Sequence, residues 1–405
     1  MRLTILTQYF PPEVGAPQNR LYELAVRLRK QGFDITILTA MPNYPSMQIH
    51  SSYRNKWMVK EEMDGLKIIR SWIYVSKNKG FIHRILNYYS FVISSFIVGL
   101  FSLRSHDYLL CESPPLFLGK TGWLLSFIFN ARFIFNVSDL WPESAEKLGI
   151  VKNKTILGIA TLLEEFLYNR SYIVTGQTQG IVKDIQKRLP HKKVYWLPNG
   201  VDISLYVPEK NDAWRKNKGF EKDDFLCLYA GIIGYAQGLE IILKAANETR
   251  NQSNIKYLLV GSGPEKEKLI QLKSELNLTQ VYFFDAVKKP EMKSILSSVD
   301  AAIIPLRKLD LFLGAIPSKI FENLAMKVPV ILGVDGEARD LFEKDGKCVL
   351  YAEPENHHEL AEKIRQLEQD PILREQLTTN GYTYVSEKFN RDIISAKFCE
   401  YLNSQ

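Results

Sequence analysis

Short apolar runs alternate with amphipathic segments along the first half of the chain. Residues 3–10 form a strand-like run, residues 19–32 carry apolar side chains at the spacing of one helical face, and residues 34–40 form a second run. A strand, a helix and a strand in this order predict a parallel pair joined by a right-handed crossover. Three later runs, YLLCES, ARFIFNVS and YIVTGQ, predict further buried strands.

The second half repeats this alternation. Six short apolar runs, from FLCLYAG to CVLYAE, are separated by helical patterns such as LEIILKAANETR. Two consecutive halves of this kind predict an α/β protein with two Rossmann-like domains. Pro198, Asn199 and Gly200 interrupt the pattern between them, which places the domain boundary at 200/201.

Residues 88–103 form an apolar stretch of their own. They carry no formal charge, but 16 residues are fewer than the roughly 20 that a membrane-spanning helix needs. Basic side chains flank the stretch. Two interpretations stay open, and both can hold at once: a buried helix of the first domain, or an interfacial helix that lies on anionic lipid. The flanking residues are Lys77, Lys79, His83, Arg84 and Arg104.

Composition and charge indicate the cellular compartment of the protein and the kinds of partner it binds. The 405 residues are 46% hydrophobic, and the four cysteines form no CxxC pair, which favours a reducing cytoplasm over a disulfide framework. The N-terminus has no secretion signal pattern. Residues 1–200 contain 25 Lys and Arg against 14 Asp and Glu, so basic surface is expected there for anionic lipid or a phosphorylated substrate. Without a nucleic-acid-binding motif, we expect no nucleic-acid partner.

Residues 317–322 carry the strongest chemical signal. Pro317 favours a helix start, whose free N–H groups attract phosphate, and Lys319 adds a positive charge. Glu322 shares one helical face with Ser318 and Lys319, where a carboxylate could accept hydrogen bonds from a ribose. Taken alone, the pattern also fits an exposed helix start with a solvated Lys–Glu pair.

Six segments in order make the chain similar to the family 4 glycosyltransferases over nearly its whole length: YFPPEVGAP, VSDLWPES, PNGVD, YAGIIGYAQGLE, LVGSGPEKEKL and PSKIFENLAMKVPVI. The PSKIFE and AQGLE forms resemble bacterial O-antigen and capsule transferases of the L-fucosamine-transferase type. This resemblance implies the GT-B fold, with two Rossmann-like domains and a cleft between them. Residues 1–200 would bind the acceptor, residues 201–385 the donor, and residues 386–405 would form a helix returning to the first domain.

The resemblance also implies roles for individual residues. Glu322 matches the glutamate that holds the nucleotide ribose, and Ser318 and Lys319 would meet the diphosphate. Asp139 matches a position that contacts the donor sugar, and the alternative is a helix-capping aspartate. The implied catalytic set is Asp139, Lys319 and Glu322. The implied donor-binding set is Gly15, Ala16, Gly231, Gly234, Gln237, Phe284, Ala286, Val287, Arg307, Gly314, Ala315, Ile316, Pro317, Ser318, Lys319 and Glu322, with residues 284–287 beside the uracil.

Two departures from the family pattern shape the expected site. The family commonly has an acidic residue eight positions before the ribose glutamate, and this chain has Gly314. We therefore expect backbone N–H groups of Gly314, Ala315 and Ile316 to grip the sugar. The usual Arg and Lys of the phosphate loop are also missing, so Lys319 is expected to compensate, together with Arg307 or Lys308.

The function implied is a retaining transfer of a sugar, such as an N-acetylated or deoxy amino sugar, from a UDP-sugar. The expected acceptor is an undecaprenyl-diphosphate-linked saccharide at the inner face of the cytoplasmic membrane, with peripheral attachment to anionic lipid. Neither a cofactor nor a metal is expected, because Lys319 would stabilise the leaving diphosphate. His191, His357 and His358 are expected to be solvated. The alternatives are a UDP-sugar 2-epimerase of the same fold, a non-catalytic nucleotide-binding subunit, and a membrane scaffold.

Overall fold

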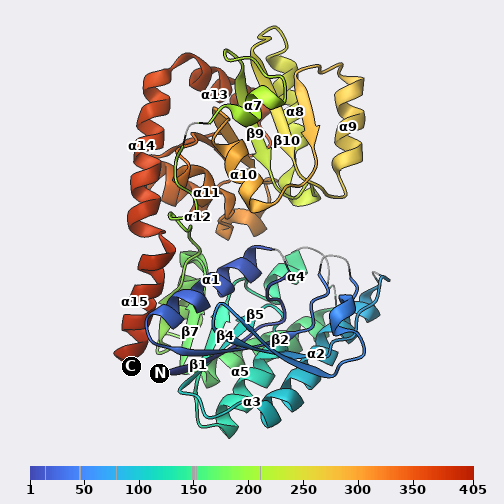
Figure 1. Ribbon diagram of the computed structural model, residues 1–405, viewed down its shortest axis with the longest axis vertical. Helices are drawn as coiled ribbons and strands as arrows, with labels where there is room; N and C mark the ends of the chain where they lie inside the picture. Colours follow the sequence, from blue (N-terminus) through green and yellow to red (C-terminus); the bar gives the residue numbers. More distant parts are fainter. Residues whose placement is uncertain (14, 45–46, 79, 148–150, 152, 210) are drawn as a thin grey trace. The chain divides into compact units, whose positions relative to one another are not determined.

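The computed structural model describes residues 1–13, 15–44, 47–78, 80–147, 151, 153–209 and 211–405. They form two compact units, each built around its own sheet, mostly parallel in unit 1 and fully parallel in unit 2 (Figure 1). Unit 1 comprises Met1–Asn199 and Arg391–Gln405, and unit 2 comprises Gly200–Asn390. The predicted α/β class is therefore confirmed, with the first break in the chain one residue before the expected position.

Unit 1 contains an eight-stranded sheet in the order β3-β4-β2-β1-β5-β6-β7-β8. Only the pairing of β3 with β4 is antiparallel. Helices cover both faces, which is why most of these strands are continuous apolar runs. The strands are β1 (Arg2–Leu6), β2 (Asp34–Ala40), β3 (Met58–Met63), β4 (Leu66–Ser71), β5 (Tyr108–Ser113), β6 (Arg132–Val137), β7 (Ile173–Gly176) and β8 (Val194–Trp196).

The helices of unit 1 form two layers. In Figure 1, α2, α3 and α5 lie on one side of the sheet and α1 on the other. The last helix, α15, packs beside α1, where Arg27 pairs with Asp392 at 2.6 Å. The elements are α1 (Ala16–Lys30), η1 (Ser51–Tyr53), α2 (Phe81–Ser102), α3 (Leu118–Ile128), α4 (Glu143–Lys147), α5 (Lys154–Arg170), α6 (Gln179–Arg188) and α15 (Arg391–Asn403).

Unit 2 contains a six-stranded, fully parallel sheet in the order β11-β10-β9-β12-β13-β14. The strands are β9 (Phe225–Ala230), β10 (Ile255–Val260), β11 (Val281–Phe284), β12 (Ala301–Pro305), β13 (Val330–Gly333) and β14 (Val349–Tyr351). The helical elements are α7 (Ala213–Asn217), η2 (Tyr235–Gln237), α8 (Glu240–Glu248), α9 (Lys266–Glu275), α10 (Lys289–Leu296), η3 (Asp310–Gly314), α11 (Lys319–Ala325), α12 (Glu337–Arg339), η4 (Asp340–Asp345), α13 (His357–Gln369) and α14 (Pro371–Lys388).

Each sheet has one point where the strand order reverses direction. In unit 2 the chain builds outward from β9 through β10 to β11 and then places β12 on the other side of β9. In unit 1 the same reversal separates β1 from β5. Ligands of open parallel sheets bind at the carboxyl ends of the strands at such a point. The loops after β9 and β12 are therefore the first place to look for a site in unit 2.

Two expected segments differ in detail from the structure. Residues 386–405 do not form one helix, because α14 ends at Lys388 and α15 begins at Arg391. The apolar stretch at 88–103 belongs to the longer helix α2, which has both a buried and an exposed face: Phe91 and Val98 lie in the core, whereas Ile93 and Ile97 are exposed.

Candidate functional site

A lysine ammonium lies beneath the first glycine after β9. The Nζ atom of Lys319, at the start of α11, is 4.0 Å from the centre of the Tyr229 ring in β9. A Cβ atom built on Gly231 would lie 2.7 Å from that Nζ, and the φ of Gly231 is 144°. The backbone conformation therefore favours glycine here, and an added Cβ would displace the Lys319 ammonium. This arrangement places a cation directly under a loop at the switch point of the sheet.

The Lys319 ammonium is largely enclosed by protein atoms, although the residue as a whole keeps some exposed surface. Burial lowers the pKa of Lys319 to about 7, and the nearby Glu322 carboxylate opposes part of this shift. Desolvation disfavours the charged form of an amine, whereas a bound anion would favour it. At neutral pH the side chain is thus poised to gain a proton when an anion arrives.

Two glycine loops pack backbone against backbone beside this lysine. The N–H of Ile233 donates to the Ser262 carbonyl at 2.9 Å. A Cβ on Gly261 would lie 1.8 Å from the carbonyl oxygen of Gly231, and one on Gly263 would lie 2.2 Å from that of Ile233. Gly231 and Gly234 were predicted to bind the donor, whereas no role was predicted for Gly261 or Gly263. The G-x-G spacing directly after a buried strand was the signal that could have identified them.

Glu322 faces the same region from the first turn of α11, where its charge acts on Lys319. The helix begins two residues after Pro317, and Ser318 is its N-cap residue, without a side-chain capping hydrogen bond. Its other face is buried, as expected, and Phe321 packs on Phe342 at 5.6 Å between ring centres. The core side of the helix thus fixes where Lys319 and Glu322 lie.

The expected compensating cations at 307 and 308 are engaged elsewhere. Arg307 donates to the carboxylates of Glu240 (2.5 Å) and Glu355 (3.1 Å), and its guanidinium stacks over the Tyr235 ring. Lys308 pairs with Glu353 at 2.7 Å. Both charges are therefore neutralised by neighbouring carboxylates, and Arg307 holds the η2 turn that contains Gln237. The role of Lys319 as a phosphate ligand stays a prediction.

The segment expected to grip the sugar is only partly suited to that task. The N–H of Ala315 donates to the Phe312 carbonyl at 2.9 Å, so the expected contact from this group to a sugar is wrong. A Cβ on Gly314 would meet nothing within 4 Å, and a Cβ on Gly336 would lie 2.1 Å from the Leu313 carbonyl oxygen. The backbone of Gly336 therefore packs against this turn, whereas no atom lies near the Cβ position of Gly314. Ile316 follows, partly exposed.

The segment expected beside the nucleobase follows β11, next to the glycine loop after β10. The carbonyl of Phe284 accepts from the N–H of Gly261 at 3.0 Å. The Phe284 ring is partly exposed and packs edge-on against Trp214, 5.5 Å away. Ala286 is exposed and Val287 half-buried. The role of this segment in binding a base stays a prediction.

The unit 1 candidates lie after β1 and β6. Gly15 is the extended N-cap residue of α1, and Ala16 begins that helix. Asp139 accepts a hydrogen bond from Ser144 Oγ at 2.5 Å, across the start of α4. Although the residue is exposed, surrounding protein atoms raise the pKa of its carboxyl. Both the capping and the sugar-contacting roles of Asp139 stay predictions.

A buried polar network that the sequence did not predict lies near the β1/β5 switch point. Arg20 of α1 pairs with Glu112 of β5 at 2.6 Å and donates to Ser138 Oγ at the same distance. Asn136 also donates to Glu112. A single arginine in an amphipathic helix gives no sign that it is buried. Glu13 likewise is buried, where it accepts N–H groups of residues 10, 43 and 44.

One group of possible metal ligands lies on α8 and α13 in the described part of the chain. Glu248 faces His358 at 2.6 Å and His357 at 3.3 Å. The expectation that His357 is simply solvated is therefore wrong, because burial lowers its pKa and it contacts a carboxylate. His191 is exposed, as expected.

The chain is similar to known glycosyltransferases in sequence and in fold. Residues 210–384 match the family "Glycosyl transferases group 1". The chain is 26% identical to the putative colanic acid biosynthesis glycosyl transferase WcaI of Escherichia coli K12, over 98% of both chains. Among solved structures, the sucrose-phosphate synthase of Thermosynechococcus elongatus aligns with a TM-score of 0.78 at 17% identity. The alignment covers 100% of this chain and 98% of that one. Against Anabaena Alr3699/HepE in complex with UDP-glucose the TM-score is 0.73, also at 17% identity, over 100% of both chains.

These likenesses confirm the expected GT-B fold. The residues that match the group 1 glycosyltransferase family, 210–384, make up most of unit 2 and include Lys319.

Proposed function

We propose that this protein is a retaining family 4 glycosyltransferase, of the L-fucosamine-transferase type, that takes a sugar from a UDP-sugar in unit 2. The observation that carries the proposal is the Lys319 ammonium held under the Gly231 loop at the switch point of the sheet. A nucleotide diphosphate over this loop would contact backbone N–H groups and the lysine together. The solved Anabaena Alr3699/HepE structure, which has the same fold, is a complex with UDP-glucose, and this supports the choice of nucleotide.

The chemistry follows from where charge develops. When the bond between the sugar and the diphosphate breaks, negative charge builds on the leaving oxygen, and a fixed cation stabilises it. Lys319 supplies that cation in the proposed mechanism, so no metal ion is needed. Glu322 orients the ribose. The acceptor hydroxyl attacks from the side of the leaving group and passes its proton to the leaving phosphate, which balances the reaction without a separate base.

The proposed acceptor is a lipid-linked saccharide, such as an undecaprenyl-diphosphate glycan, at the inner face of the cytoplasmic membrane. The name of the relative WcaI refers to colanic acid biosynthesis, which supports a surface polysaccharide as the product. The donor sugar we propose is an N-acetylated or deoxy amino sugar. The product would enter a surface polysaccharide such as an O-antigen, a capsule or an exopolysaccharide.

Thermal stabilisation by UDP tests the nucleotide site. UDP should raise the melting temperature of the protein, and Glu322→Ala should abolish most of that rise because the ribose loses its acceptor. Glu362→Ala, an exposed change on α13, is the matched control and should respond like the parent. Equal stabilisation of Glu322→Ala and the parent would reject the site. A screen of UDP-sugars with a lipid-diphosphate acceptor then tests transfer.

A further inference from the structure

Helix α2 buries small and polar side chains and exposes large apolar ones. Ser94 and Ser95 are 0% exposed, and Asn87 is buried as well. These groups are satisfied inside unit 1: Ser94 donates to the Trp72 carbonyl, and Asn87 Nδ2 donates to the Tyr74 carbonyl at 2.7 Å. A helix of a water-soluble surface has the opposite pattern, with its polar side chains turned outward.

The outward face of α2 is continuously apolar. Its exposed residues recur every three or four positions, and from Ile85 to Ser102 the helix carries no charged residue. The side chain of Leu125 of α3 lies against Gly99, and α3 extends the face with Phe127, which is 77% exposed, and Ile128. Large exposed apolar patches mark contact sites. The exposed face of α2 includes Leu86, Tyr89, Ile93, Ile97, Leu100 and Phe101.

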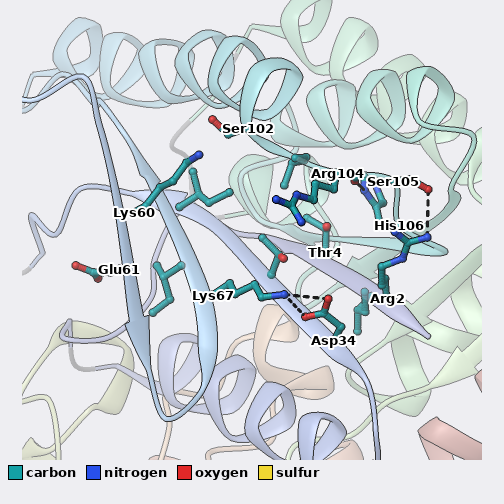
Figure 2. Close-up of a pocket in the computed structure, with 15 residues that line it drawn as sticks. Arg2, Thr4, Asp34, Lys60, Glu61, Lys67, Ser102, Arg104, Ser105 and His106 are labelled. Carbon is teal, nitrogen blue, oxygen red and sulfur yellow. Dashed lines mark hydrogen bonds and ion pairs between the residues drawn. The ribbon is translucent and has the colours of Figure 1, made fainter.

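A basic pocket opens at the C-terminal end of the same helix. It has a volume of about 390 Å³ and is lined by Ser102 and Arg104 together with residues at the starts of β1, β2 and β4 and along β3 (Figure 2). Figure 2 shows Lys60 and Arg104 directed into this space. Next to it, Ser102 contacts Met58, which is exposed along with Trp57. The pocket and the apolar face therefore meet at one end of α2.

The charges of the pocket favour an anion. Its two carboxylates are already paired: Asp34 with Lys67 at 2.7 Å, and Glu61 with Arg70 at 2.6 Å. Among the described residues, neither the Lys60 ammonium nor the Arg104 guanidinium has an ion-pair or hydrogen-bond partner. Two uncompensated cations beside an apolar surface match the phosphate and the acyl region of an anionic lipid.

We propose that the exposed face of α2 and the basic pocket together dock unit 1 on an anionic membrane, with a lipid phosphate in the pocket. This inference rests on the proposed use of a lipid-linked acceptor. The helix lies in the plane of the interface and does not span it, because its inner face contributes Phe91 and Val98 to the core. A second copy of the chain is a poorer occupant, since it would bring two like-charged pockets together.

Sedimentation with vesicles tests the apolar face. The protein should bind vesicles that contain phosphatidylglycerol and bind phosphatidylcholine vesicles far more weakly. The double variant Ile93→Asp/Ile97→Asp should lower the partition coefficient roughly tenfold or more, because both side chains leave the hydrocarbon boundary. Ile372→Asp, at a residue that is 79% exposed on α14 in unit 2, should bind like the parent. Unchanged binding of the double variant would overturn the proposal. A second result would also overturn it: the parent protein does not bind vesicles but forms a dimer, and the double variant is monomeric.

The pocket has its own test. Arg104→Glu should remove most of the preference for phosphatidylglycerol, whereas Lys397→Glu, the same kind of charge change on α15 in the other helix layer, should keep it. An equal loss of the phosphatidylglycerol preference in the two variants would show that only the net charge of the protein determines binding. This result would overturn the assignment of the pocket. UDP stabilisation is measured on every variant. It should persist throughout, so a failure of membrane docking is distinguished from a failure of the nucleotide site.

Discussion

The Lys319 ammonium and the face of the Tyr229 ring lie 4.0 Å apart, so the cation of α11 rests on the last part of β9. Tyr229 is held in turn by its hydroxyl, which donates to the Ile232 carbonyl at 2.5 Å. The strand, the glycine loop and the lysine are thus connected by direct contacts. A cation that is positioned before a ligand arrives needs little reorganisation on binding.

Replacing Lys319 should raise the stability of the protein and weaken its binding of UDP. The pKa of Lys319 is about 7 in the folded protein against an ordinary 10.5, so burying the charge costs stability. That cost is fully present below pH 7 and disappears as the pH rises toward 10.5. Lys319→Met should therefore raise the melting temperature by a few degrees at pH 6 while UDP stabilisation is lost. Lys268→Met on α9, an exposed lysine, is the control and should change neither. A lower melting temperature for Lys319→Met at pH 6 would contradict a buried charge.

Donor affinity should depend on pH through the same group. A bound diphosphate stabilises the ammonium and raises its pKa above 7, so binding takes up a proton. Affinity for a UDP-sugar should be constant below about pH 6 and fall as the pH rises above 7. Titration calorimetry at several pH values measures this, with a UDP-sugar as ligand because its diphosphate diester does not titrate in this range. The slope should vanish in Lys319→Met; a slope that survives the substitution would assign it to another group.

The glycines of the two loops should differ in what they tolerate. Gly231→Ala meets the mobile end of Lys319 and strains a φ of 144°, so it should weaken UDP binding with a loss of roughly 1–2 kcal/mol in stability. Gly261→Ala meets a backbone carbonyl at 1.8 Å and should be the more destabilising of the two. Gly158→Ala, on α5 with open space around its Cβ, should be neutral or slightly stabilising. Chemical denaturation ranks the three, and a Gly261→Ala protein as stable as Gly231→Ala would refute the packing argument.

Gly314 allows a direct test of the missing acidic residue. A side chain there enters open space, so Gly314→Glu should unfold at the temperature of the parent. If the sugar lies beside this residue, the new carboxylate should change which UDP-sugars stabilise the protein, while UDP itself binds as before. A UDP-sugar profile identical to that of the parent would place the sugar elsewhere. A change at UDP as well would place the nucleotide too close to residue 314.

The buried pair of unit 1 should be far more sensitive than an exposed one. Glu112→Ala leaves the Arg20 guanidinium buried without its carboxylate, and breaking such a pair costs about 3–5 kcal/mol. Asp34→Ala removes an exposed partner of Lys67, and such pairs contribute less than about 1 kcal/mol. Urea unfolding compares the two variants. Similar losses would show that Arg20 reaches solvent.

The architecture was predictable because parallel sheets covered on both faces produce long apolar runs. Runs such as FLCLYAG and VPVILG could hardly form anything but buried strands, and β9 and β13 are found there. The position of Lys319 and Glu322 on one face of a short helix was likewise predictable from helical spacing, since Phe321 and Leu324 had to turn toward the core.

What failed depended on contacts between distant residues. Nothing local to Arg307 indicates that Glu240 and Glu355 neutralise it, because these partners lie 67 and 48 positions away. The use of the Ala315 N–H inside a 3₁₀ turn depends on how residues 309–315 fold back, which Gly336 supports from another part of the chain. The sequence also did not predict that α2 buries serines and exposes large apolar side chains. An apolar run in which serine is the most polar residue shows no clear helical periodicity of hydrophobic and polar positions.

Helix α15 gives unit 1 an unusual order of assembly. Its residues Phe398 and Leu402 are fully buried in the core of unit 1, and the carbonyl of Leu402 accepts from Tyr108. During synthesis the ribosome makes all of unit 2 before it makes this helix. Unit 1 can therefore complete the helix layer that contains α1 only after α15 has been synthesised. Chaperone dependence and sensitivity to C-terminal truncation should accordingly concentrate in the N-terminal half.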